Sequence, residues 1–184
     1  VTPDTGIPGA SLSGITTVLT DKGVATFYGL TIDRQGAGYQ LTATSPIPPV
    51  GTLWAWGDDS SGQLGDGTTN DRATPVLVSG GYSWASISAG YVQTCGVTIG
   101  DHAYCWGTNP YGLGDGGSAT STTPVLVGGG HSWASVSAAT YYACGMTTQG
   151  LAYCWGDNDH GQVGDGSNTD SNVPVLVLSL IHIS

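Results

Sequence analysis

The sequence predicts an all-β protein made of repeated small antiparallel sheets, and three observations lead to that prediction. A tryptophan-glycine segment recurs around Trp56, Trp106 and Trp155, and a period near 50 residues with several short strands is typical of propeller blades. Strand-favouring Val, Thr and aromatic residues are abundant, while helix-forming Lys, Arg and Glu are nearly absent. All 13 acidic residues are aspartates, which together with the 31 glycines suit turns.

Each repeat has the same parts in the same order. A Trp-Gly strand comes first, at 53–57, 103–107 and 152–156. A glycine-aspartate loop follows, at 62–67, 112–116 and 161–166. An apolar strand led by proline comes next, at 75–78, 124–127 and 174–177, and proline suits the start of an edge strand. A strand of small residues begins at Trp84 and again at Trp133, and we expect it to be innermost because small side chains let strands crowd together. The complete unit then runs outward through strands at 84–89, 93–98, 102–107 and 124–127.

The turn between the second and third strands predicts how the cysteines pair. Five residues before each recurring tryptophan stand Gly51, Asp101 and Gly150, residue types that tolerate a left-handed backbone. With the turn placed there, Cys95 faces Cys105 and Cys144 faces Cys154. We therefore expect one disulfide in each unit, although four cysteines allow three pairings, and free thiols or a metal site remain open alternatives. Stable disulfides imply an oxidising location outside the cytoplasm.

The first two units each depart from the repeat pattern. Ala55 stands where the other units have a cysteine, and the two inner strands of the first unit are missing before it. We expect those strands to come from the far end of a ring, from missing blades of the same full-length chain. The loop of the second unit lacks a counterpart of Gln63 before Leu113, which predicts a shifted loop.

The chain divides into four segments. Residues 51–177 are the repeats, and 46–50 are a proline-rich linker. Residues 178–184 break the pattern and are interpreted as a non-native tail, the alternative being an ordinary apolar strand. Within residues 1–45, strands are expected at 23–28 and 38–44. With 29–33 between them, they resemble the closing part of a bacterial immunoglobulin-like domain of the invasin and intimin type. The resemblance implies a β-sandwich remnant whose earlier strands are missing, with residues 1–20 poorly anchored.

The repeats resemble those of the regulator of chromosome condensation family. The resemblance rests on Ala-Tyr-Cys-Trp-Gly, Gly-Gln-x-Gly-Asp-Gly, Thr-Pro-Val and Trp-Ala-x-x-Ser-Ala-Gly, which recur in order over residues 51–177. It implies a propeller, usually of seven blades, of which this chain would supply about two and a half four-stranded blades. The family's founder binds chromatin and exchanges guanine nucleotide on a small GTPase, and a similar activity is kept here as a remote alternative.

Composition argues against several classes of function. A net charge of −10 opposes binding to nucleic acid and to anionic lipid, because both need clustered Lys and Arg. No segment reaches the ~20 apolar residues of a membrane span, so membrane insertion is not expected. No serine elbow, HExxH motif or phosphate loop is present, so we do not expect an enzyme.

Aromatic residues in loops are the candidate binding residues, because exposed aromatic side chains make good anchors. These candidates are Tyr91, Tyr111, Tyr141, Tyr142 and His160. The recurring tryptophans could form a sugar-binding platform, but their strict recurrence favours packing between blades. Asp157, Asp159 and Asp165 are candidate calcium ligands, although Gly161 replaces a ligand of the calcium-loop pattern, and no other cofactor is expected.

We therefore expect a non-enzymatic binding or display module of a secreted or surface-attached bacterial protein, which recognises a protein or a glycan through loops on one propeller face. The alternative is an architectural spacer that has no ligand.

Overall fold

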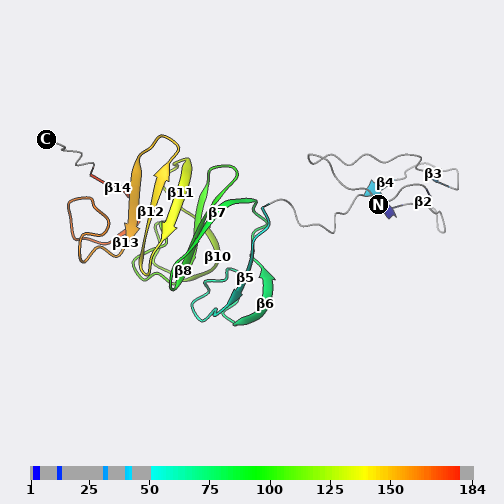
Figure 1. Ribbon diagram of the computed structural model, residues 1–184, viewed down its shortest axis with the longest axis horizontal. Coiled ribbons are helices and arrows are strands. Elements are labelled where there is room, and N and C mark those ends of the chain that lie inside the picture. Colours follow the sequence, from blue (N-terminus) through cyan, green and yellow to red (C-terminus); the bar gives the residue numbers. More distant parts are fainter. Residues whose placement is uncertain (1, 5–11, 14–30, 33–39, 43–50, 179–184) are drawn as a thin grey trace. The chain divides into compact units, whose positions relative to one another are not determined.

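The computed structural model describes residues 2–4, 12–13, 31–32, 40–42 and 51–178 (Figure 1). The chain divides into two compact units, Val1–Pro48 and Pro49–Ser184. The described residues of the first unit form two short antiparallel ladders. They pair β1 (Thr2–Asp4) with β4 (Gln40–Thr42), and β2 (Leu12–Ser13) with β3 (Thr31–Ile32).

These ladders differ in part from what the sequence predicted. β4 lies within the strand predicted at 38–44, whereas the strand predicted at 23–28 lies outside the described residues. β1 and β2 both have strand partners. The expectation that residues 1–20 are poorly anchored stays a prediction, because most of these residues lie outside the described ones. The ladders by themselves do not identify an immunoglobulin-like sandwich.

Within 51–178, the second unit forms three antiparallel sheets of two, four and four strands. The two-stranded sheet pairs β5 (Trp54–Gly57) with β6 (Arg72–Leu77). The next sheet follows the chain through β7 (Trp84–Ala89), β8 (Gln93–Thr98), β9 (Ala103–Gly107) and β10 (Ser121–Leu126). The last does the same through β11 (Trp133–Ala138), β12 (Tyr142–Thr147), β13 (Ala152–Gly156) and β14 (Ser171–Leu176).

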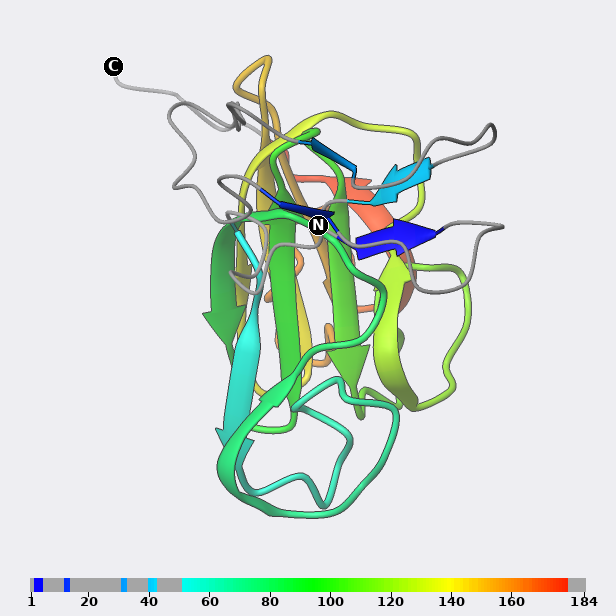
Figure 2. The same cartoon turned by 90° about the vertical axis from the view of Figure 1, so that its right-hand side faces the viewer.

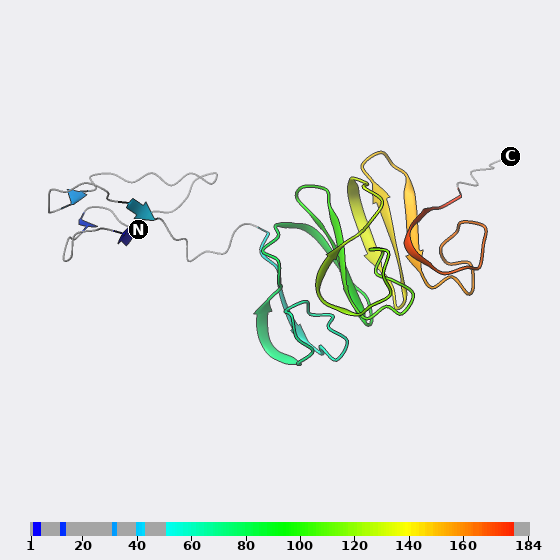
Figure 3. The same ribbon diagram turned by 180° about the vertical axis from the view of Figure 1, so that it is seen from behind.

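The two four-stranded sheets are copies of one another that stand side by side, as the repeats predict (Figures 1 and 3). β11 lies against β7 and β8 of the preceding sheet, and Ala138 N donates to Ser88 Oγ across this boundary at 3.0 Å. The small-residue strand β11 therefore forms this boundary, against both β7 and β8. This confirms an all-β, propeller-like array of half a blade and two whole ones. The described residues contain no helix long and apolar enough to cross a bilayer.

The second and third strands of each complete sheet have the predicted register. Val97 lies opposite Ala103, and the turn between them places Asp101 at a φ of 61°. Gly51 and Gly150, at the corresponding positions, also have positive φ. All three predicted turn residues therefore adopt the left-handed backbone that their types tolerate.

The cysteines pair within each sheet. Disulfides join Cys95 to Cys105 and Cys144 to Cys154, directly across the β8–β9 and β12–β13 pairs. None of the four cysteines is free. The structure thus selects disulfides over free thiols and over a metal site.

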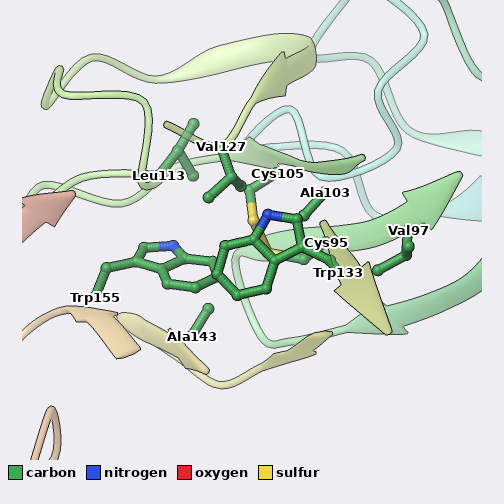
Figure 4. Close-up of a cluster of buried hydrophobic side chains, with 9 residues drawn as sticks. All are labelled: Cys95, Val97, Ala103, Cys105, Leu113, Val127, Trp133, Ala143 and Trp155. Carbon is green, nitrogen blue, oxygen red and sulfur yellow. A yellow bond between two sulfur atoms is a disulfide. The ribbon is translucent and has the colours of Figure 1, made fainter. Parts of the chain in front are cut away.

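Tryptophans fill the space between successive sheets (Figure 4). Trp155 and Trp133 pack against the preceding sheet, where they meet Cys105 and Leu113. Trp106 is buried at the boundary between the two-stranded sheet and the first four-stranded sheet, in a cluster that contains Val78. Packing between blades is therefore confirmed for two of the three recurring tryptophans, and each contributes a large apolar area to the boundary.

The third recurring tryptophan, Trp56 in β5, is 63% exposed, so the prediction of packing between blades is wrong for it within the described residues. A hollow of about 490 Å³ also lies beside β5, lined by Ala55 and Ile87 among others. At the next boundary, Val136 stands in the place of Ile87 and packs on the cluster that contains Cys95 of β8. The hollow therefore corresponds to the place of a second strand, which the two-stranded sheet lacks.

The short loop of the second unit leaves the blade intact but changes one hydrogen bond. In the first unit, Gln63 O accepts hydrogen bonds from Trp106 Nε1 and from Thr94 Oγ1, both at 2.9 Å. The second unit has no counterpart of Gln63, and Trp155 Nε1 is buried without a partner among the described residues. Ala143 replaces Thr94 at this boundary, so one of the two donors is removed together with the acceptor.

The repeat continues slightly beyond its predicted end. Leu178 N donates to Gly164 O at 2.9 Å, which repeats the bond from Gly128 N to Gly114 O at 2.8 Å in the unit before. Leu178 therefore belongs to the repeat rather than to the expected tail, and residues 179–184 lie outside the described residues.

Candidate functional site

The candidate site lies at one end of the sheets. In an antiparallel four-stranded sheet, the first and third connections lie at the same end. We call this end the loop face, and it consists of loops 58–71, 90–92, 108–120, 139–141 and 157–170. Backbone bonds tie these loops together, because Thr108 N donates to Val92 O and Asp157 N donates to Tyr141 O, each at 2.8 Å. Figure 2 shows the loop that joins β5 to β6 at the lower end of the sheets.

Two of the predicted binding residues meet on the loop face. The ring centroids of Tyr111 and Tyr141 lie 6.0 Å apart with an interplanar angle of 70°, an edge-to-face arrangement that aromatic pairs favour. Tyr141 belongs to the β11–β12 connection and is 38% exposed. Tyr111 belongs to the loop after β9 and is half-buried. The pair therefore joins loops of two neighbouring sheets.

Buried amides hold the loop that carries Tyr111. Asn109 Oδ1 accepts a hydrogen bond from Tyr111 N at 3.0 Å, and Asn109 Nδ2 donates to Gln93 Oε1 at 3.2 Å. Gln93 Nε2 in turn donates to Tyr142 O of the next sheet at 2.9 Å. Because Asn109 and Gln93 are almost completely buried, this network positions Tyr111 relative to the following blade.

Three carboxylates lie beside the tyrosine pair. Asp157, Asp159 and Asp170 each have an oxygen within 4.8 Å of the other two. The charge of Asp157, together with burial and the charges of Asp159 and Asp170, raises the pKa of Tyr111, because a tyrosinate would add another negative charge to the group. The site is thus an aromatic pair bordered by negative charge.

The other predicted binding residues do not join this site. Tyr91 is 77% exposed but lines the hollow beside β5. Tyr142 is half-buried and pairs with Gly156 at the start of β12. His160 is exposed, and its backbone N–H donates within its own loop, to Gln162 Oε1 at 2.8 Å.

The predicted set of calcium ligands changes by one residue. Asp165 does not join Asp157 and Asp159, because it accepts hydrogen bonds from the backbone and hydroxyl of Ser167, which lower the pKa of Asp165. Asp170 joins them instead. Carboxylate oxygens suit Ca²⁺, but Ca²⁺ takes about 6–8 oxygen ligands, so three carboxylates alone do not make a complete site.

Sequence reasoning missed Asp170, although a repeat signal marks it. Asp170 Oδ1 accepts from Asn158 N at 2.8 Å, and Asp71 Oδ1 accepts from Asp59 N at 2.9 Å in the first unit. Both bonds span 12 residues. An aspartate at this offset from the buried loop residue could therefore have been recognised.

The buried residue at the base of each long loop leads to a prediction about stability. Asp59 occupies the place of Asn109 and Asn158, is fully buried, and has its pKa raised by burial. Because its pKa is higher in the folded chain, ionisation of Asp59 costs stability as the pH rises through that value. Asp59→Asn is therefore expected to raise the free energy of unfolding by about 1 kcal/mol near neutral pH, as measured by urea denaturation.

This gain should shrink as the pH falls below the pKa of Asp59. Asp58→Asn is the matched control, because Asp58 is exposed and hydrogen bonds from Ser60 lower its pKa. A carboxylate with a lowered pKa contributes stability above its unfolded pKa, so Asp58→Asn should not stabilise the chain at neutral pH. A gain of equal size in both variants would contradict the role of burial.

Two family models match the chain. The model described as "Regulator of chromosome condensation (RCC1) repeat" matches residues 50–97 and 149–183. A second model with the same description matches residues 133–162. The matches cover parts of all three sheets.

Relatives with similar sequences are long proteins. The chain is 34% identical over 74 residues to "X-linked retinitis pigmentosa GTPase regulator homolog" of Caenorhabditis elegans, which covers 39% of the chain and 5% of that protein. It is 35% identical over 75 residues to human "E3 ubiquitin-protein ligase HERC2", covering 39% of the chain and 2% of that protein. It is 32% identical over 96 residues to "Ultraviolet-B receptor UVR8" of Arabidopsis thaliana, covering 51% of the chain and 21% of that protein. The chain thus spans a small part of each relative.

Solved structures share the fold at low sequence identity. Human WBSCR16 matches with a TM-score of 0.62 and 21% identity, over 70% of this chain and 35% of that one. Prp20p of Saccharomyces cerevisiae matches with a TM-score of 0.59 and 21% identity, over 68% of this chain and 34% of that one. These likenesses concern the fold alone.

Proposed function

The chain carries RCC1 repeats that form a propeller-like array, and on this premise we propose that it is a non-enzymatic binding module that recognises a protein or a glycan through its loop face. The observation that carries the proposal is the Tyr111–Tyr141 pair. Aromatic side chains supply much of the binding energy of interfaces. Rings held in place before binding also lose less conformational freedom when a ligand arrives.

Two further features bear on the location of the module and on how its first blade is completed. The two disulfides favour an oxidising compartment, at the cell surface or outside the cell. The hollow beside β5 and the exposed Trp56 favour completion of the first blade by strands of the same protein. A longer reading frame of this protein that contains no copy of 84–98 besides 133–147 would contradict this completion.

The proposed function is tested by selecting ligands and then removing the aromatic pair. The chain is immobilised and exposed to a glycan array and to a displayed peptide library. Tyr111→Ala/Tyr141→Ala is expected to weaken binding of a selected ligand by about tenfold or more, because two aromatic anchors are lost. Biolayer interferometry measures the change.

The chain offers a matched control at its opposite end. Ile99 and Leu151 are 72% and 45% exposed and lie in the connections between second and third strands. Ile99→Ala/Leu151→Ala should leave binding unchanged. An equal loss in both double variants would contradict a loop-face site, and failure to select any ligand would favour the architectural spacer.

A further inference from the structure

We propose that the Tyr111–Tyr141 pair and the neighbouring carboxylates bind a positively charged side chain of a protein partner. This inference rests on the proposed binding function and names the chemistry that the site would recognise. It follows from the ring geometry, from the charge around the rings, and from a comparison of the same positions in the other blade.

The aromatic pair provides surfaces that attract a cation. A cation near the face of a tyrosine ring is attracted by the negative charge of the π system. In an edge-to-face pair, the edge of one ring covers at most one face of the other, so ring faces remain available. Both rings come from loops, and Tyr141 is 38% exposed, so a side chain of a partner can reach them.

The charge beside the rings is negative, and loops 108–120, 139–141 and 157–170 contain no lysine or arginine. Asp157, Asp159 and Asp170 gather their carboxylates within 4.8 Å of one another. Asp157 also accepts hydrogen bonds from Asp159 N and Gln162 Nε2, but both donors are neutral and leave its charge in place. The basic residue of segment 51–178, Arg72, is paired with Asp66 in the first unit.

The fold does not require these charges, because the preceding blade is built without them. Its residues at the same three positions are Thr108, Pro110 and Thr120. There, the hydroxyl groups of Thr108 and Thr120 make a neutral hydrogen bond at 3.1 Å. Three carboxylates within 4.8 Å of one another repel each other. The acidic residues at these positions therefore cost free energy that a bound cation would offset.

The occupant that fits both features is an arginine or lysine side chain. Its charged group can approach the carboxylates, while its aliphatic stem or guanidinium plane lies on a tyrosine ring. A neutral ligand can donate hydrogen bonds to the carboxylates but leaves their charge uncompensated, and an acidic ligand is repelled by it. The partner is therefore expected to present a basic segment to the loop face.

The experiment titrates the folded chain with N-acetylarginine amide and follows Tyr111 and Tyr141 by NMR. The control ligand is N-acetylcitrulline amide, which has nearly the same shape and no charge. We expect saturable shifts of both tyrosines with the arginine derivative and at least about fivefold weaker binding of the citrulline derivative. Raising the salt concentration from about 50 to about 500 mM should weaken arginine binding several-fold.

Two double variants separate local charge from net charge. Asp157→Asn/Asp159→Asn keeps hydrogen-bond acceptors but removes two charges, and it should weaken arginine binding about fivefold. Asp4→Asn/Asp101→Asn removes the same charge outside the loops of the loop face and should leave binding unchanged. Equal affinity for arginine and citrulline, or equal effects of the two double variants, would overturn the proposal.

Calcium and neutral ligands have distinct outcomes. If about 1 mM Ca²⁺ shifts the backbone signals of 157–159 and displaces the arginine derivative, the carboxylates belong to a metal site and the proposal is wrong. If selected ligands need the tyrosines but carry no basic group, the proposed binding function stands and the cation inference fails. If the arginine derivative binds as expected while no macromolecular ligand is selected, the cation site stands and the proposed function fails.

Discussion

Replacing Cys95 and Cys105 together by alanine is expected to lower the free energy of unfolding by about 3 kcal/mol or more. Their disulfide has a sequence separation of 10, and closing a loop of that length in the unfolded chain accounts for about 3 kcal/mol in the chain-entropy description. Both cysteines are fully buried in the cluster that contains Trp133 and Trp155. Losing the two sulfur atoms therefore adds a cavity cost, and urea denaturation measures the sum.

The second disulfide is the matched comparison. Cys144 and Cys154 have the same sequence separation of 10, so the loop contribution should be the same. Cys144 is only half-buried, so Cys144→Ala/Cys154→Ala should cost about 1 kcal/mol less than the first double variant. Under mild reduction, alkylation and mass spectrometry should also find Cys144–Cys154 reduced first. Equal stability losses and equal reduction rates would contradict the role of the core in protecting the first disulfide.

Inserting a glutamine between Gly112 and Leu113 is expected to raise the free energy of unfolding by about 1–3 kcal/mol. Trp155 is fully buried, and its Nε1 has no hydrogen-bond partner among the described residues. A buried donor without a partner costs its full desolvation energy, of about 1–3 kcal/mol. The insertion would restore a counterpart of Gln63, whose carbonyl accepts from Trp106 Nε1 at 2.9 Å.

Phenylalanine substitutions test whether the restored carbonyl is the cause. Trp106→Phe removes a hydrogen bond and leaves Gln63 O with one donor fewer, whereas Trp155→Phe removes an unpaired donor. Trp106→Phe should therefore cost about 1 kcal/mol more than Trp155→Phe in the unaltered chain. In the insertion variant the two substitutions should cost nearly the same. Equal costs before the insertion would show that Trp155 Nε1 already has an acceptor, such as an internal water.

The parts of the fold that depend on local pattern were predictable. A single turn residue, Asp101, places Cys95 opposite Cys105, because side chains alternate along a strand and a hairpin turn determines which residues face each other. The repeat then carries the same pairing to Cys144 and Cys154. Burial of Trp155 followed from the same regularity.

The candidate site was predictable only in part. Tyr111 and Tyr141 were chosen as separate loop residues, and nothing in their sequence positions says that their rings meet. Asp170 was missed because Asp165 stands closer to the other acidic residues in sequence, yet Asp165 turns to Ser167 instead. Trp56 looks like its counterparts in sequence but is exposed.

The sequence by itself determined the period, the strands of each repeat, their hairpin register and the two disulfides, because these depend on alternation, turn chemistry and residues close together in the chain. Only the tertiary structure decided which tryptophans are covered, which indole lacks an acceptor, and which tyrosines and aspartates share one surface. Those features depend on how one sheet lies against the next, and a loop that is one residue shorter, or a strand that is missing, changes that packing without changing the local pattern of its neighbours.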